Sequence, residues 1–173
     1  RFVFQSEVLF AVNSAELSDQ ARVDLSVLAD ALKEISGSIP DDRLYCPRYD
    51  MWVQDAGNGE VLIGATCFGV FLAGEIIAFT SKPNGAEVDI GRGMGTVECR
   101  KTVLAVHAPI SFILLEGNEA AEERPRLVNI APYGDGWMAR ARPTRWAEEK
   151  SLLVDGAAYR RHILAIEPEA VVD

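Results

Sequence analysis

The residue best placed for chemistry is Lys101, which lies in a short polar segment between two hydrophobic runs. β-Branched residues occur on both sides: Val97 precedes the segment, and Val103 and Val106 follow it. Two such runs around a polar centre predict a β-hairpin with the lysine at its exposed tip. An amine held clear of the core suits covalent attachment of a long group; the alternative is a solvated turn residue. Lysine is scarce in this chain and occurs only at Lys33, Lys82, Lys101 and Lys150.

The other reactive side chains form no catalytic or metal-binding pattern. Neither His107 nor His162 belongs to a recognisable catalytic motif, and no Gly-x-Ser-x-Gly sequence is present. The glycine-rich stretch 91–95 predicts a tight turn, because the helix that a phosphate-binding loop requires does not follow it. The spacing of the cysteines matches no metal site and indicates free thiols in a reducing cytosol. They are Cys46, Cys67 and Cys99.

The elements around the predicted hairpin are mostly short strands. Asn58-Gly59 is a strong hairpin turn between the first two strands, and residues 66–73 predict a short helix. Asp155 is a good N-cap for a C-terminal helix reaching about residue 164, and a further helix begins near Thr144. The predicted strands are 51–54, 61–64, 74–79 (buried), 87–91 (an exposed edge), 110–115 and 137–142. This pattern predicts a mainly β fold, a flattened barrel or sandwich with short helices.

Residues 1–41 predict a separate βα appendage. Residues 2–10 are rich in strand formers, and a helix begins at Ser18 and ends near Gly37. Apolar residues at three- and four-residue steps predict one stripe on this helix. They are Val23, Leu25, Val27, Leu28, Ala31, Leu32 and Ile35. The polar, helix-breaking stretch 40–42 predicts a boundary, which leaves residues 42–173 as the main domain.

Charge and hydropathy restrict the classes of partner. The chain of 173 residues has a net charge of −9, with 26 acidic against 17 basic residues. Nucleic acids and anionic membrane surfaces bind positive faces, so neither is an expected partner. No apolar run approaches the ~18 residues of a membrane span, and no basic segment precedes an apolar one as in a secretion signal. We therefore expect a cytoplasmic protein.

Several motifs resemble the glycine cleavage system H protein family. Glu98-Cys-Arg-Lys101, followed by 106–111, is similar to the family's lipoylation hairpin, Glu-Ser-Val-Lys-Ala and then Tyr-Ser-Pro-Val-Ser-Gly. The stretch 127–138 resembles Leu-Val-Asn-x-x-Pro-Tyr-Gly-x-Gly-Trp-Leu, and 45–53 resembles the opening Tyr-Thr-Pro-x-His-x-Trp-Val. The matching motifs occur in order over residues 44–165.

The resemblance implies a carrier that is not an enzyme. Lipoate would be amide-linked to Nζ of Lys101, and Glu98 would help a lipoylating enzyme to recognise that lysine. The implied partners are a pyridoxal-phosphate glycine decarboxylase, a tetrahydrofolate-dependent aminomethyltransferase and a flavin-dependent dihydrolipoyl dehydrogenase. Two residues depart from the family pattern: Arg100 adds a cation beside the lysine, and Phe112 stands where the family generally has glycine. We expect the 132–137 segment to be structural and to shape one wall of a groove near the arm.

Three alternatives stay open at this point. One is an H-like carrier that serves another lipoate-dependent system. A second is a biotinyl carrier, although the Ala-Met-Lys-Met surroundings of biotinylated lysines are missing. The third is a non-catalytic scaffold associated with the cell wall, because 8–18 resembles the start of an OmpA-like peptidoglycan-binding domain. Only the first part of such a domain is present, so we expect no wall binding from it.

Overall fold

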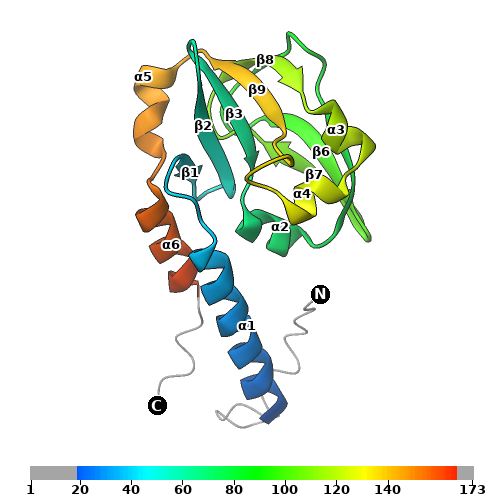
Figure 1. Ribbon diagram of the computed structural model, residues 1–173, viewed down its shortest axis with the longest axis vertical. Helices are drawn as coiled ribbons and strands as arrows, with labels where there is room; N and C mark the ends of the chain where they lie inside the picture. Colours follow the sequence, from blue (N-terminus) through cyan, green and yellow to red (C-terminus); the bar gives the residue numbers. More distant parts are fainter. Residues whose placement is uncertain (1–18, 167–173) are drawn as a thin grey trace.

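The structure, a computed structural model, describes residues 19–166 (Figure 1). The predicted strand at 2–10 and the tail after residue 167 lie outside the described residues. The helices are α1 (Asp19–Gly37), α2 (Cys67–Ala73), α3 (Glu119–Glu123), α4 (Arg126–Ile130), α5 (Trp146–Glu149), a 3-10 turn (Lys150–Leu152) and α6 (Gly156–Ala165). The strands are β1 (Leu44–Cys46), β2 (Met51–Gly57), β3 (Glu60–Ala65), β4 (Ile76–Ser81), β5 (Glu87–Val88), β6 (Gly93–Cys99), β7 (Thr102–His107), β8 (Phe112–Gly117) and β9 (Ala139–Pro143).

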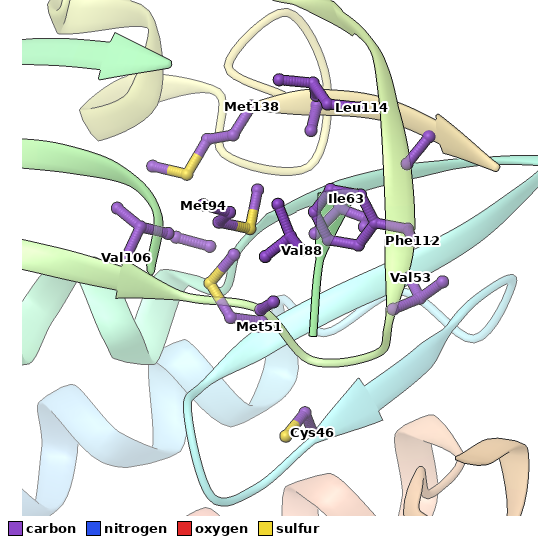
Figure 2. Close-up of a cluster of buried hydrophobic side chains, with 14 of the residues drawn as sticks. Cys46, Met51, Val53, Ile63, Val88, Met94, Val106, Phe112, Leu114 and Met138 are labelled. Carbon is purple, nitrogen blue, oxygen red and sulfur yellow. The ribbon is translucent and has the colours of Figure 1, made fainter. Parts of the chain in front are cut away.

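The strands form two antiparallel sheets with the main core between them. One sheet has the order β1-β2-β3-β9-β8-β5 and the other the order β4-β6-β7. Buried side chains from both sheets pack together, and Figure 2 shows Met51, Met94 and Met138 directed toward one another near Val88. The six-stranded sheet ends at β1 and β5 and does not close on itself. The fold is therefore a sandwich, one of the two forms that the sequence predicts.

Strand β2 contributes side chains to two different cores. Met51 and Val53 belong to the cluster between the sheets, whereas Trp52 belongs to a second cluster on the opposite face. This alternation follows from the two-residue period of a strand. The β2–β3 turn has positive φ at Asn58 (56°) and Gly59 (74°), as a type I′ hairpin requires. The Asn-Gly prediction is confirmed.

The second cluster joins the N-terminal helix to the sandwich. Helices α1 and α6 lie side by side below the sheets (Figure 1). The cluster's buried members come from α1, its C-terminal extension, β1, β2, α2 and α6: Leu32, Ile39, Tyr45, Trp52, Phe68, Tyr159 and Ile163. Tyr45 and Tyr159 stack with ring centroids 4.8 Å apart. Helix α1 therefore shares a core with the region that resembles the H protein.

The predicted apolar stripe of α1 is only partly correct. Leu25 and Leu32 are buried, but Val23 is 56% exposed and Val27 is 42% exposed. Ala21 lies on the buried face, and Val23 is two residues, about 200°, around the helix from it. The two valines therefore point away from α2 and α6.

Three other elements differ from the sequence prediction. Strand β4 is not fully buried, because only one of its faces meets the core and Ile77 is 48% exposed. Strand β5 at the sheet edge has two residues only. Helix α4 was not predicted, because Pro125 suggested the end of a loop; the proline instead precedes the first turn of a helix, where its missing N–H has no cost.

Trp52 allows a prediction about the second cluster. Its indole Nε1–H donates to the carbonyl oxygens of Ala65 and Pro132, at 3.0 Å each. Trp52→Phe keeps an aromatic ring but leaves both buried acceptors without this donor. We expect the free energy of unfolding to fall by about 1–2 kcal/mol in urea denaturation followed by circular dichroism. Trp146→Phe, at a partly buried indole whose N–H donates to no described residue, should change it by less than about 0.5 kcal/mol. Equal losses would contradict this role of the hydrogen bonds.

Candidate functional site

The hairpin that holds Lys101 is formed by β6 and β7. Cys99 is the register partner of Thr102, so Arg100 and Lys101 form a two-residue turn. Among the described residues only Asp50 and Asn58 are non-glycine residues with positive φ. The turn is therefore neither type I′ nor type II′, which both need a positive φ. The hairpin prediction is confirmed.

Side chains on β6 alternate between the core and the exposed face. Val97 and Cys99 are each 5% exposed and hold the hairpin to the sandwich, with Val106 of β7 beside them. Glu98, one of the predicted site residues, is exposed and lies opposite Val103 of β7. The strand is therefore fixed on one face while Glu98 and the turn face outward.

The two cations of the turn differ in their contacts. Arg100 pairs with Glu75 at 2.6 Å, between side chains that are 66% and 55% exposed. An ion pair this exposed contributes only about 0–1 kcal/mol. Lys101 is exposed and makes no hydrogen bond or ion pair with any residue in 19–166. The ion pair directs the added cation toward Glu75 and leaves the lysine amine accessible.

Two hollows lie on either side of α2 beside the hairpin. The larger, of about 990 Å³, is lined by Leu28 of α1, Phe71 and Leu72 of α2, and Lys101. The smaller, of about 250 Å³, is lined by residues of α2 and β7 and does not include Lys101. No residue of 132–137 lines the larger hollow, so the prediction that this segment forms a wall of the groove near the arm was wrong.

Segment 132–137 instead holds other elements in place, which agrees with its predicted structural role, and Asn129 just before it does the same. The Tyr133 hydroxyl accepts a hydrogen bond from Cys67 N–H at 3.1 Å, at the start of α2. A Cβ at Gly136 would lie 2.4 Å from the carbonyl oxygen of Leu127, so a side chain has no room there. Asn129 accepts from Ile76 N–H at 2.9 Å and donates to Ile76 O at 2.8 Å. The sequence analysis did not predict the hydrogen bonds between Asn129 and Ile76, which hold this segment next to Glu75. The asparagine of the Leu-Val-Asn motif was the feature of the sequence that could have indicated them.

A buried hydrogen-bond chain links α6, α2 and the segment before β2. Tyr159 donates to Oδ1 of Asp50 at 2.8 Å, and its oxygen lies 2.8 Å from the Thr66 hydroxyl. Thr66 is also the N-cap of α2 and accepts from Gly69 N–H. Because a hydroxyl has one proton, Thr66 donates to Tyr159. Burial raises the pKa of Tyr159, which therefore acts as a donor throughout the physiological range.

Asp50 should make stability depend on pH. Burial raises the pKa of its carboxyl above the ordinary 3.8, and the Tyr159 hydrogen bond and the His162 charge oppose this. The folded state then binds more protons than the unfolded state, so this residue's contribution to stability decreases as pH rises above 3.8. Asp50→Asn removes the ionisation. We expect its free energy of unfolding, relative to the parent, to increase as pH rises above 3.8 and to become constant once Asp50 is ionised in the folded state, as measured in urea titrations. A constant difference would contradict this assignment.

The histidines have structural contacts. His107 Nδ1 lies 3.0 Å from the Gly91 carbonyl oxygen, and its ring stacks on Tyr49 with centroids 5.2 Å apart. His162 stacks on Tyr159 at 6.0 Å. Across residues 19–166 no group of three or more His, Cys, Asp or Glu side chains is arranged to hold a metal ion. In the same part of the chain, no helix combines the length and the apolar character of a membrane span.

Comparison with known proteins identifies the family. The family model "Glycine cleavage H-protein" matches residues 43–165. Glycine cleavage system H protein 5 of Aquifex aeolicus is 36% identical over 129 residues, which is 72% of this chain and 86% of that protein. The H protein of Laribacter hongkongensis is 36% identical over 126 residues, 73% of this chain and 98% of that protein.

A solved structure agrees with the sequence comparison. The crystal structure of a glycine cleavage system H protein from Mycobacterium marinum superposes with a TM-score of 0.62 and 32% identity. It covers 70% of this chain and 95% of the M. marinum chain. Helix α1 precedes the residues that the family model matches. The matched region runs from just before β1 to the end of α6 and agrees with the resemblance over residues 44–165 that the sequence motifs indicate. This chain is a member of the glycine cleavage H-protein family.

Proposed function

We propose that this chain is the lipoyl carrier of a glycine cleavage system, with lipoate attached to Nζ of Lys101. The observation that carries the proposal is the position of this amine: it is exposed, lies at a two-residue turn, and forms no hydrogen bond or ion pair in the described part of the chain. The attachment is an amide, formed from the lipoate carboxyl group and the amine with overall loss of water. An accessible lysine is all that the bond requires of the protein.

The protein's own contribution is to position the arm. The hairpin is fixed to the core by Val97 and Val106, so the point of attachment is held while a flexible arm moves. When bound, lipoate supplies a dithiolane that carries an aminomethyl group and is reduced as it accepts that group. The partners are a glycine decarboxylase, an aminomethyltransferase and a dihydrolipoyl dehydrogenase. The chain performs no bond chemistry; the tether raises the effective concentration of cargo at each docked partner. We place this function in the cytoplasm.

Mass spectrometry tests the attachment. The full chain is incubated with a lipoylating enzyme and a lipoyl donor, and the intact mass is compared before and after. We expect one lipoyl group per chain, located on Lys101 by peptide mapping. An unmodified chain, or a group on Lys33, Lys82 or Lys150, would contradict the proposal.

Glu98 has a proposed role in recognition by the lipoylating enzyme. It is exposed three residues before the lysine, on the strand that the core holds in place. Glu98→Gln removes the charge but keeps the shape, so we expect attachment to slow by roughly tenfold, as for loss of one charge-assisted hydrogen bond. Glu87→Gln, at an exposed position on β5, is the control and should react at the parent rate. Equal rates for all three proteins would remove Glu98 from recognition.

Another lipoate-dependent system is the second candidate, favoured by the surface beside the lysine. Helix α1 and the Arg100–Glu75 pair both border the larger hollow, and α1 lies outside the family match. Such additions alter what a partner enzyme meets when it approaches Lys101. Carbon dioxide release from glycine by glycine decarboxylase, with the lipoylated chain as acceptor, separates the two candidates. Release at the rate supported by an authentic H protein favours glycine cleavage; no release favours the other system.

A further inference from the structure

Glu75 lies on a stretch of backbone that is held on both sides. Before it, Gly74 ends α2 with a φ of 84°, and its N–H donates to the Val70 carbonyl oxygen at 3.0 Å. After it, the side-chain amide of Asn129 bonds both the N–H and the carbonyl oxygen of Ile76, at 2.9 and 2.8 Å. The backbone position of Glu75 is therefore fixed by α2 and by α4.

This backbone brings Glu75 beside the turn that carries Lys101. Ile76 is the register partner of Cys99 in the ladder between β4 and β6. Because these strands are antiparallel, the ladder then places Glu75 opposite Arg100, and their side chains pair at 2.6 Å. The arginine of the turn thus has a carboxylate partner that another element holds in place.

Glu98 is a second carboxylate within reach of Arg100. The two residues are two positions apart in the chain, and such residues on a strand have Cα atoms about 6.6 Å apart, a distance that an arginine side chain can span. Glu98 is exposed, and its carboxylate forms no hydrogen bond or ion pair with any residue in 19–166. Residues directly opposite on antiparallel strands are closer, with Cβ atoms about 4.5–5.5 Å apart. The shorter separation explains why Arg100 pairs with Glu75 rather than with Glu98.

We propose that Glu75 is a positioning residue for lipoyl attachment: it holds Arg100 away from Glu98 and leaves that carboxylate available to the lipoylating enzyme. This inference rests on the proposed function, since it requires attachment at Lys101 and recognition through Glu98. Without Glu75, the cation beside the lysine would compete with the enzyme for Glu98. A weak exposed pair, favoured roughly two- to fourfold over the separated state, would already cover Glu98 for most of the time.

The rate of lipoyl attachment to the full chain tests this role, with the intact mass followed over time. Glu75→Gln removes the charge but keeps the shape, so Arg100 is released. We expect attachment to slow by roughly two- to fourfold, less than for Glu98→Gln, because Glu98 is covered for only part of the time. KM for the chain should rise while kcat stays unchanged, since the enzyme at saturation displaces the arginine. In chains that already carry Arg100→Gln or Glu98→Gln, adding Glu75→Gln should have no further effect.

Glu148→Gln is the matched control, because it breaks another exposed ion pair. Glu148 pairs with Arg145 at 3.2 Å, between side chains that are 69% and 57% exposed. This variant should react at the parent rate, and melting curves identify any variant that does not fold. NMR gives a second measurement that needs no enzyme. Nuclear Overhauser contacts between the side chains of Arg100 and Glu98 should appear in the Glu75→Gln chain and be absent from the parent.

The possible outcomes separate this inference from the proposed function. A parent chain that accepts no lipoyl group overturns both. A parent chain that is modified, with Glu75→Gln reacting at the same rate and showing no Arg100–Glu98 contacts, overturns the inference alone. An equal loss in the Arg100→Gln background shows that Glu75 acts through the fold or on the enzyme directly, and also overturns it. An equal loss for Glu148→Gln shows an effect of net charge, with the same consequence.

Discussion

Lys101→Arg should abolish lipoyl attachment completely while leaving the protein folded. Arginine keeps the length and charge of the side chain, but its guanidinium group stays protonated and is not an acyl acceptor under these conditions. The side chain is exposed, forms no hydrogen bond or ion pair with a described residue and is not part of the core cluster, so its replacement removes nothing from the core. We expect an unmodified intact mass after treatment with a lipoylating enzyme and a melting temperature within about 1 °C of the parent.

Lys82→Arg is the matched control for this variant. Lys82 is also exposed and follows a strand of the same three-stranded sheet, at the end of β4. It should accept one lipoyl group per chain at the parent rate, because Lys101 is intact. Residual modification of the Lys101→Arg chain would show that another lysine is the target. It would contradict the proposal that Lys101 carries the lipoyl group.

Leu32→Ala should produce the largest loss of stability among the substitutions proposed here. Leu32 is 1% exposed and packs in the cluster with Trp52, Phe68 and Tyr159. Removing a fully buried leucine side chain costs the transfer free energy of the lost atoms and that of the cavity left behind. We expect the free energy of unfolding to fall by about 2–5 kcal/mol in urea denaturation.

The control separates burial from helix propensity. Val27→Ala lies on the same helix at a position that is 42% exposed, and should change the free energy of unfolding by less than about 0.5 kcal/mol. A small effect of Leu32→Ala would show that α1 is only loosely docked. It would also favour the sequence-based prediction that residues 1–41 form a separate βα appendage with a boundary at residues 40–42.

The sequence predicts where the helices and strands lie better than it predicts which elements pack against one another. Two-residue alternation is a local property, so β2, β3 and the hairpin around Lys101 could be located from the pattern alone. The helix from Asp19 to Gly37 could be located as well, but not its partner, because seven apolar residues do not show which of two faces is covered. Val23 and Val27 were misassigned for this reason. The buried face is decided by α6 and α2, which follow much later in the chain.

The residues of the candidate site could be predicted from local motifs, whereas the contacts between its distant segments could not. Lys101 and Glu98 could be found from a short motif, and the structure places both on the exposed side of one hairpin. The pairing of Arg100 with Glu75 and the groove walls from α1 depend on contacts between segments far apart in sequence. No local pattern indicates such contacts. The resemblance to an OmpA-like domain at 8–18 concerns residues outside the described range, and the helix that follows packs on the carrier fold.

The position of the hairpin within its sheet has a consequence for the motion of Lys101. Among the described strands, β6 is hydrogen-bonded to β4 and β7, whereas β7 is bonded to β6 alone. Detaching β7 breaks one ladder and detaching β6 breaks two, so backbone amides should exchange with deuterium sooner in β7. Thr102, which follows Lys101, therefore begins the side of the hairpin that opens first, whereas the strand that carries Glu98 keeps its register and holds the attachment point in place.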